Sequence, residues 1–206
     1  MFKKLSLFAA MVLVSSELFA LPVEIRGVRL SGSGCGPATA TAIVTADGQT
    51  MSVLFDHYSA EIGQGSENPQ MRVMQKNCNI MIDVSVPLGM QYAITQTDYR
   101  GFAALPATAF GYHRFTQVIP GTSMPSLREA QLRGPQAQNY SVTVMQKPGR
   151  EVYSTCNNRS QMINLLSELM VSYLPNTRDN TMAQINLDST DTGVNSSFKL
   201  IWRSCR

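Results

Sequence analysis

The sequence predicts an all-β protein, a β-sandwich of jelly-roll-like or flattened-barrel form with roughly ten strands and two disulfides. Short segments alternate apolar and polar residues along the chain, and Gly, Pro, Asn and Asp separate these segments. Many short strands at regular spacing are typical of sandwiches and barrels. Four cysteines behind an export leader favour two disulfides.

The strand candidates follow one another along the whole chain. They are residues 23–31, 38–46, 51–58, 78–86, 90–99, 111–118, 139–146, 182–188 and 197–204. Asp47-Gly48 lies between the second and third candidates, which is a hairpin signal. Residues 61–70 are a polar loop. Residues 119–138 carry three prolines and two glycines, so we expect a long exposed connection there.

The segment QMINLLSELMVSYL at 161–174 fits two structures. Leu166, Leu169, Met170 and Tyr173 have helical spacing, and the composition tolerates a helix. Equally, Ile163, Leu165, Leu169, Val171 and Tyr173 lie at alternate positions, as on one face of a strand. Periodicity therefore leaves helix and strand open for this segment.

The first 20 residues have the features of a signal peptide. Lys3 and Lys4 form a positive amino-terminal region, residues 5–14 form a short apolar core, and Ala20 suits the last position before cleavage. Such a short core cannot cross a bilayer, which requires about 20 apolar residues. We therefore expect cleavage near Ala20, export to the extracellular space or periplasm, and a single domain over residues 21–206.

The charge of the predicted mature part is nearly balanced, with 15 basic and 13 acidic residues scattered evenly. An even scatter does not make the basic patch that nucleic-acid binding requires. No later segment is apolar enough to span a membrane. We expect a monomer that has no membrane span and no nucleic-acid partner.

All four cysteines lie after the leader, and three pairings are possible. We favour Cys35 with Cys78 and Cys156 with Cys205. Each pair closes a loop of about 40 to 50 residues, which on the chain-entropy model stabilises the fold by about 4 kcal/mol. Metal binding is the weaker hypothesis, because no two cysteines lie within 40 residues of each other and the chain has only two histidines.

Six segments match, in order, a family of known sequences. They are GSGCGP (32–37), LFDHYSAEIG (54–63), KNCNIMIDVSVPLGMQYAI (76–94), TDYRGFAAL (97–105), GPQAQNYSVTV (134–144) and DSTDTGVNSSFKLIWRSC (188–205). The chain thus resembles the family named domain of unknown function 4360, small exported proteins of bacteria and fungi. The resemblance implies an exported β-rich domain, supports two disulfides and favours a strand at 162–173. It implies no reaction.

The common catalytic and nucleotide-binding motifs are absent, so we assign no catalytic, cofactor-binding or metal-binding residue and expect no cofactor. We interpret His57 and His113 as structural or surface residues. In a strand, Asp56 and His57 would point to opposite faces and could not act together. A glycosidase needs two carboxylates about 5 to 10 Å apart. The candidates are Asp56, Asp98, Asp188 and Asp191, of which the last two suit turns.

Two aromatic patterns bear on carbohydrate binding. Trp202 shares a face with Phe198 and Leu200, which is typical of a core residue. Exposed rings at Tyr58, Tyr99 or Tyr112 would instead favour a carbohydrate-binding surface.

The stretch TDYRGFA contains Asp98, Tyr99 and Arg100, a candidate surface or structural cluster. Alternation sends Asp98 and Arg100 to one side, where they could pair, and Tyr99 to the core. Gly101 suits a turn or bulge. The sequence thus predicts a secreted or envelope-associated, non-enzymatic binding or structural module, with cell-envelope or extracellular polysaccharide as a candidate partner. The alternative is a secreted hydrolase with a carboxylate site acting on polysaccharide.

Overall fold

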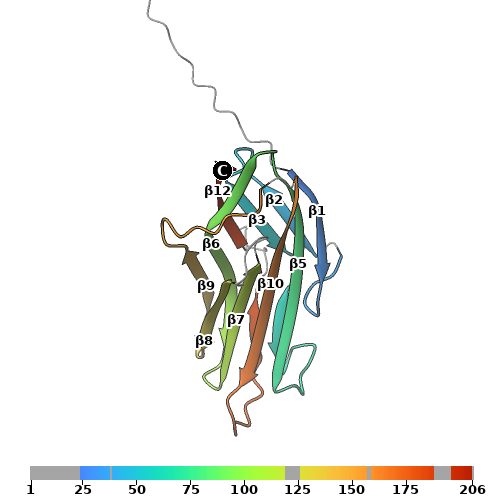
Figure 1. Cartoon of the computed structure of the whole chain (residues 1–206). Coiled ribbons are helices and arrows are strands. Elements are labelled where there is room, and N and C mark those ends of the chain that lie inside the picture. Colours follow the sequence, from blue (N-terminus) through green and yellow to red (C-terminus); the bar gives the residue numbers. More distant parts are fainter. Residues whose placement is uncertain (1–23, 38, 119–125, 157–158, 188–195, 206) are drawn as a thin grey trace, which may run out of the picture.

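The fold is an all-β sandwich, as the sequence predicts (Figure 1). The computed structural model describes residues 24–37, 39–118, 126–156, 159–187 and 196–205. Within these ranges twelve strands form two sheets, no segment is helical, and the sheets do not close into a barrel. The predicted leader, residues 1–20, lies outside the described residues.

The first sheet has five strands, which all pair in antiparallel fashion. Long strands β5, β10 and β7 run side by side at its centre (Figure 1). Across the sheet the order is β1 (Glu24–Ser31), β5 (Val73–Ser85), β10 (Ser160–Tyr173), β7 (Ala109–Val118) and β8 (Ser126–Arg133).

The second sheet has seven strands and is also antiparallel. Its order is β2 (Ala40–Val44), β3 (Thr50–Phe55), β12 (Ser196–Ser204), β6 (Met90–Leu105), β11 (Ala183–Asn186) and β4 (Ser59–Ile62), with β9 (Gln136–Met145) paired to β6. The predicted hairpin joins β2 to β3, and Gly48 adopts the positive φ of 66° that its turn requires.

The ambiguous segment 161–174 is a strand, β10, at the centre of the five-stranded sheet. It pairs with β5 on one side and β7 on the other, so both of its edges are satisfied. Ile163, Leu165 and Leu169 alternate toward the core, and each is fully buried. Period-two burial therefore overrides the helical propensity of the segment.

The core lies between the inner faces of the two sheets and is rich in aromatic residues. Most side chains there come from alternating strand positions, which is why the short apolar periodicity predicts the fold; Tyr58, Val86 and Leu187 lie just outside strands. The largest fully buried side chains include Tyr58, Tyr92, Phe55, Phe198 and Met51.

Two expectations about the connections were wrong. Residues 119–138 are not simply an exposed connection, because β8 and the start of β9 fall within them. The sequence of β8 is polar because it is an edge strand; among its described side chains Ala130 and Leu132 are partly buried, and Glu129, Gln131 and Arg133 are exposed. The strand predicted at 51–58 ends at Phe55, and the unpredicted short strand β4 follows a turn.

Candidate functional site

A polar pocket of about 270 Å³ lies where the edges of the two sheets meet. Its lining comes from residues 33–34, the 57–61 segment, residues 67–68, and Met74 and Lys76 of β5. Strand β4 is the last strand of its sheet, and β1 covers β5 only from Asn79 to Ser85. Two strand edges are therefore left open beside each other, and the polar pocket occupies the space between them.

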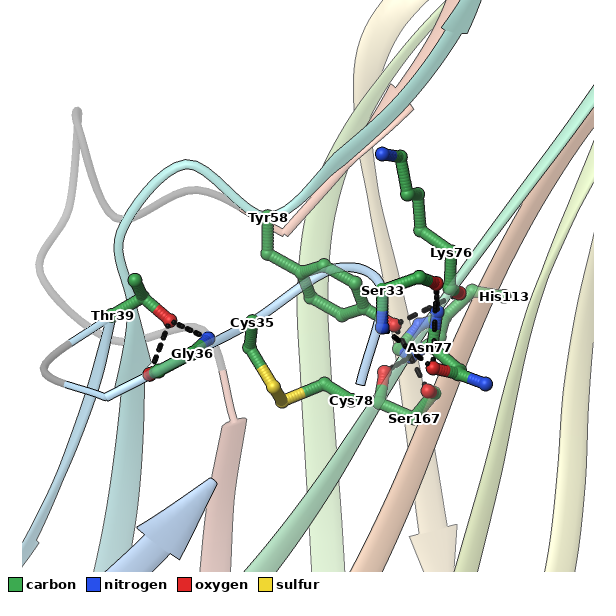
Figure 2. Close-up of a disulfide and its surroundings, with 10 residues drawn as sticks. All are labelled: Ser33, Cys35, Gly36, Thr39, Tyr58, Lys76, Asn77, Cys78, His113 and Ser167. Carbon is green, nitrogen blue, oxygen red and sulfur yellow. Dashed lines mark hydrogen bonds between the residues drawn. A yellow bond between two sulfur atoms is a disulfide. The ribbon is translucent and has the colours of Figure 1, made fainter. Parts of the chain in front are cut away.

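The first wall of the polar pocket is the loop 32–37, which a disulfide ties to β5 (Figure 2). We call the Cys35–Cys78 bond the pocket disulfide and the Cys156–Cys205 bond the terminal disulfide. Both bonds have the pairing that the sequence favours. The amide N–H of Ser33 donates to Oδ1 of Asn77 at 2.9 Å, and the amide N–H of Asn77 donates to Oγ of Ser33 at 3.0 Å. The wall is held by covalent and hydrogen bonds.

A buried tyrosine supports this wall from behind. A Cβ atom added to Gly34 would overlap the ring of Tyr58, so only glycine lets the loop approach so closely. Tyr58 is fully buried, and its hydroxyl donates to the carbonyl of Ser167 at 2.9 Å (Figure 2). Burial raises the pKa of Tyr58 far above its usual value. Tyr58 is thus a structural support and offers no exposed ring.

The opposite wall is the loop after β4. Gly63 begins it with a positive φ of 89°, and Oγ of Ser66 donates to the Gly63 carbonyl at 2.8 Å. The amide N–H of Asn68 then donates to Ser66 Oγ at 3.1 Å, and that of Glu67 donates to Oε1 of Glu61 at 3.3 Å. Local hydrogen bonds therefore fix this wall as well, and the polar pocket is preformed.

The charged groups of the polar pocket are not neutralised by one another. Glu61, Glu67 and Lys76 all line it, yet no ion pair joins Lys76 to either carboxylate among the described residues. In Figure 2 the Lys76 side chain extends away from the pocket disulfide. A bound molecule can therefore accept hydrogen bonds from the ammonium group and donate to the carboxylates.

His57 stands at the rim of the polar pocket with its side chain 86% exposed. The prediction that Asp56 and His57 point apart was wrong, because His57 lies in a turn with φ 56° and not in a strand. Its Nε2 lies 3.3 Å from Oδ1 of Asp56. The sequence interpretation of His57 as a surface residue nevertheless agrees with this exposure.

His113 is structural, because it lies between the sheets with 3% of its surface exposed. Its Nε2 is 3.2 Å from Oγ of Ser167, and the rings of Tyr99, Phe115 and Tyr140 surround it. Burial lowers the pKa of His113 to about 3. His113 is therefore a neutral, buried imidazole, which agrees with its interpretation as a structural residue.

The TDYRGFA stretch lies in the middle of β6, and its side chains do separate by alternation. Tyr99 is buried against Phe115, whereas Asp98 accepts hydrogen bonds from Gln96 at 2.7 Å and Thr143 at 2.6 Å. Arg100 is exposed, and the described residues give it no ion pair with Asp98. The three residues do not converge on a pocket.

Gly101 in the same stretch permits a close approach of neighbouring strands. An added Cβ would overlap the carbonyl oxygen of Asn186 and lie 2.6 Å from the hydroxyl of Tyr140. Tyr140 is partly buried against the core at this point. The glycine therefore serves packing on both sides of β6.

The remaining candidates do not assemble into a second site. Asp56 contacts His57 and Asp98 contacts Thr143, while Asp188 and Asp191 lie outside the described residues. Within the described ranges, no group of three or more histidine, cysteine or acidic side chains could hold a metal ion.

Two aromatic side chains, those of Trp202 and Tyr112, are partly exposed to solvent. Trp202 packs against the core as predicted, and its Nε1 donates to the Gly48 carbonyl at 2.8 Å. Tyr112 is half-buried, with its hydroxyl donating to Glu168 at 2.7 Å and Arg114 lying over its ring. Since one face of Tyr112 is covered, it is not a free stacking platform.

Among the residues that line the polar pocket, only His57 is a candidate suggested by the sequence. One signal was available. The favoured Cys35–Cys78 pairing places the loop 32–37 next to residues 76–78, and therefore next to Lys76. Glu61 and Glu67 had no comparable signal. Glu67 lies in the predicted polar loop, whose path the sequence does not reveal, and Glu61 lies in strand β4, which the pattern did not predict.

Comparison with known proteins supplies one relative and several distant solved structures. An "Uncharacterized secreted protein" of Arthroderma benhamiae is 28% identical over 183 residues, which is 89% of this chain and 72% of the relative. The two disulfides are likewise consistent with an extracellular location. The described residues form no helix long and apolar enough to cross a membrane.

Two carbohydrate-binding modules are among the solved structures. TmCBM61, solved with β-1,4-galactotriose, is 7% identical over 88% of this chain and 90% of its own, with a TM-score of 0.31. A family 11 module of Clostridium thermocellum, solved with a mixed-linked tetrasaccharide, is 9% identical over 85% and 94%, with a TM-score of 0.20. These likenesses are too distant to bear on function.

The family match is decisive by contrast. The family described as "Domain of unknown function (DUF4360)" matches residues 22–205, which is nearly the whole predicted mature chain. The order of the quoted segments, the paired cysteines and this match agree. The chain therefore belongs to the DUF4360 family.

Proposed function

We propose that the protein is a secreted saccharide-binding module and that the polar pocket is its binding site. In this proposal residues 1–20 are removed near Ala20, and residues 21–206 act as a single domain without a catalytic role. The observation that carries the proposal is the preformed polar pocket, whose lining includes Glu61, Glu67 and Lys76 with no ion pair between them.

The lining suits a molecule rich in hydroxyl groups. Each sugar hydroxyl both donates and accepts, and the polar pocket offers carboxylate acceptors at Glu61 and Glu67 and an ammonium donor at Lys76. The hydroxyl of Ser59 can serve in either sense. Because both walls are already fixed, little conformational entropy is lost when a ligand binds.

The test is a binding screen of the mature protein against soluble and cell-wall polysaccharides by affinity electrophoresis and calorimetry. We expect Glu61→Gln to weaken binding of the selected saccharide by about tenfold, since a charged hydrogen bond is lost. Glu24→Gln, an exposed carboxylate on β1, is the matched control and should leave the dissociation constant unchanged. Equal binding by both variants, or no retained polysaccharide, would contradict the proposal.

Polysaccharide hydrolysis is the second candidate, because Glu61 and Glu67 line the same pocket. Glycoside hydrolysis uses two carboxylates that flank the scissile bond. Reducing-end release should therefore be measured on every polysaccharide that binds. Release that disappears in both Glu61→Gln and Glu67→Gln would replace the binding module with an enzyme; absence of release supports the binding role.

A further inference from the structure

We propose that the saccharide bound in the polar pocket carries an ammonium group, as the 2-amino-2-deoxyglucose units of a deacetylated polymer do. The proposal rests on the saccharide-binding function above and names its ligand class. It follows from the balance of charge around the polar pocket, which differs from the nearly balanced charge of the chain as a whole.

The lining is negative overall. Glu61 and Glu67 contribute two carboxylates, and Lys76 contributes one ammonium group. Asp56 is not part of the lining, but its carboxylate lies 3.3 Å from the ring of His57, which is. A neutral saccharide would leave the excess negative charge without a partner, whereas a cationic saccharide supplies one.

The two carboxylates are also held where a ligand can reach them. Glu61 is a partly exposed residue of β4, and the amide of Glu67 is bonded to it at 3.3 Å, which fixes the loop beside the strand edge. Neither carboxylate forms an ion pair with a described cation. Both therefore remain available to accept from an incoming ammonium group, which donates three hydrogen bonds.

Lys76 restricts how much positive charge the ligand can carry. Its ammonium group lines the same space, so a polycation packed densely against the whole pocket would meet repulsion. An amino sugar avoids this conflict, because its hydroxyl and ring oxygens can accept from Lys76 while its amine donates to the carboxylates. The mixed lining thus fits an amino sugar better than a simple polyamine.

The ligand pair for the test differs by a single group. Binding of a glucosamine tetramer and an N-acetylglucosamine tetramer is compared by calorimetry at pH 6 and low salt, with spermine as the simple polyamine. We expect the amine-bearing tetramer to bind about tenfold more tightly than the acetylated one, and salt to reduce that difference. Spermine should bind more weakly than the amine-bearing tetramer.

Three variants locate the effect. Glu67→Gln should weaken the amine-bearing tetramer several-fold more than the acetylated one. Lys76→Met removes a donor to the oxygens that both tetramers share but also removes repulsion of the amine, so it should weaken the acetylated tetramer more than the amine-bearing one. Lys199→Met, an exposed lysine on β12, removes the same charge outside the polar pocket and should change neither affinity. Thermal melting of each variant verifies that it is folded.

The outcomes separate the two proposals. Equal or tighter binding of the acetylated tetramer, tightest binding by spermine, or exclusive binding of another polysaccharide overturns the amino-sugar inference and leaves the saccharide-binding function in place. An absence of binding to every saccharide tested overturns both.

Discussion

Acidification should destabilise this protein through His113, well before its carboxylates become protonated. The imidazole lies between the sheets, surrounded by the rings of Tyr99, Phe115 and Tyr140, and burial lowers its pKa to about 3. In the unfolded chain a histidine has a pKa of about 6.5. The unfolded state therefore binds a proton at a pH where the folded state does not.

The sign and size of the effect follow by linkage. Because the folded pKa is depressed, the contribution to stability is fully present above pH 6.5 and is lost as the pH falls from 6.5 toward 3. Each pH unit in this window changes the free energy of unfolding by about 1.4 kcal/mol. Between pH 8 and pH 5 the expected loss is about 2 kcal/mol.

Urea denaturation at pH 8 and pH 5 measures this loss directly. The chain has only two histidines, so His57→Gln is the matched control and should keep the full pH dependence. His113→Gln cannot be protonated; we expect it to be less stable at pH 8 and to lose most of the difference between the two pH values. A wild-type protein equally stable at both pH values, or a His113→Gln variant with the full dependence, would refute the reasoning.

The other predictions concern packing and cross-links. Gly101→Ala should lower the free energy of unfolding by about 1 to 3 kcal/mol, because the added methyl group overlaps the Asn186 carbonyl and the Tyr140 hydroxyl. Arg100→Ala, at an exposed position, should change the free energy of unfolding by less than about 0.5 kcal/mol. Denaturant midpoints in the reverse order would contradict the packing role of Gly101. Replacing both cysteines of either disulfide by serine should cost about 4 kcal/mol. Only loss of the pocket disulfide should also weaken saccharide binding, measured at a temperature where both variants are folded.

The strand pattern was predictable because almost every core side chain occupies an alternating position. Ile80, Ile82 and Val84 in β5 are an example, since their spacing of two matches their burial between the sheets. The segment 161–174 shows the limit of this signal. Its period fits both a helix and a strand, and only the pairing of β10 with two neighbours decides between them.

The errors share a physical cause, which is that edge strands carry weak sequence signals. Leu132 of β8 packs against the core between exposed polar residues, and β4 has only four residues, so neither strand shows a long apolar alternation. The turn at His57 was missed for a similar reason. A non-glycine residue with positive φ carries no clear signature in the sequence, so the strand was extended through it.

The polar pocket was not predictable from the sequence, because it forms only where the edge strand β4 and the open edge of β5 meet. Loop 32–37, strand β4, its following loop and the open half of β5 are distant in the sequence, and the pairing of the two sheets alone brings them together. TDYRGFA is the opposite case. Its polar residues are contiguous and conspicuous, yet alternation in β6 sends them to different faces, so that contiguity in the sequence counts against a shared site.

Open strand edges usually invite another strand to pair with them, and this protein covers the edge between β4 and β5 with polar groups. Three devices act there: the loop 32–37 bonds to Asn77, the pocket disulfide fastens that loop, and Glu61 and Lys76 place charges beside the remaining edge. Protection of an edge requires only charge and a cover. It does not require walls that are held rigid around a space of about 270 Å³. The bonding within both walls is therefore the feature that supports the proposed binding role over simple protection of an edge.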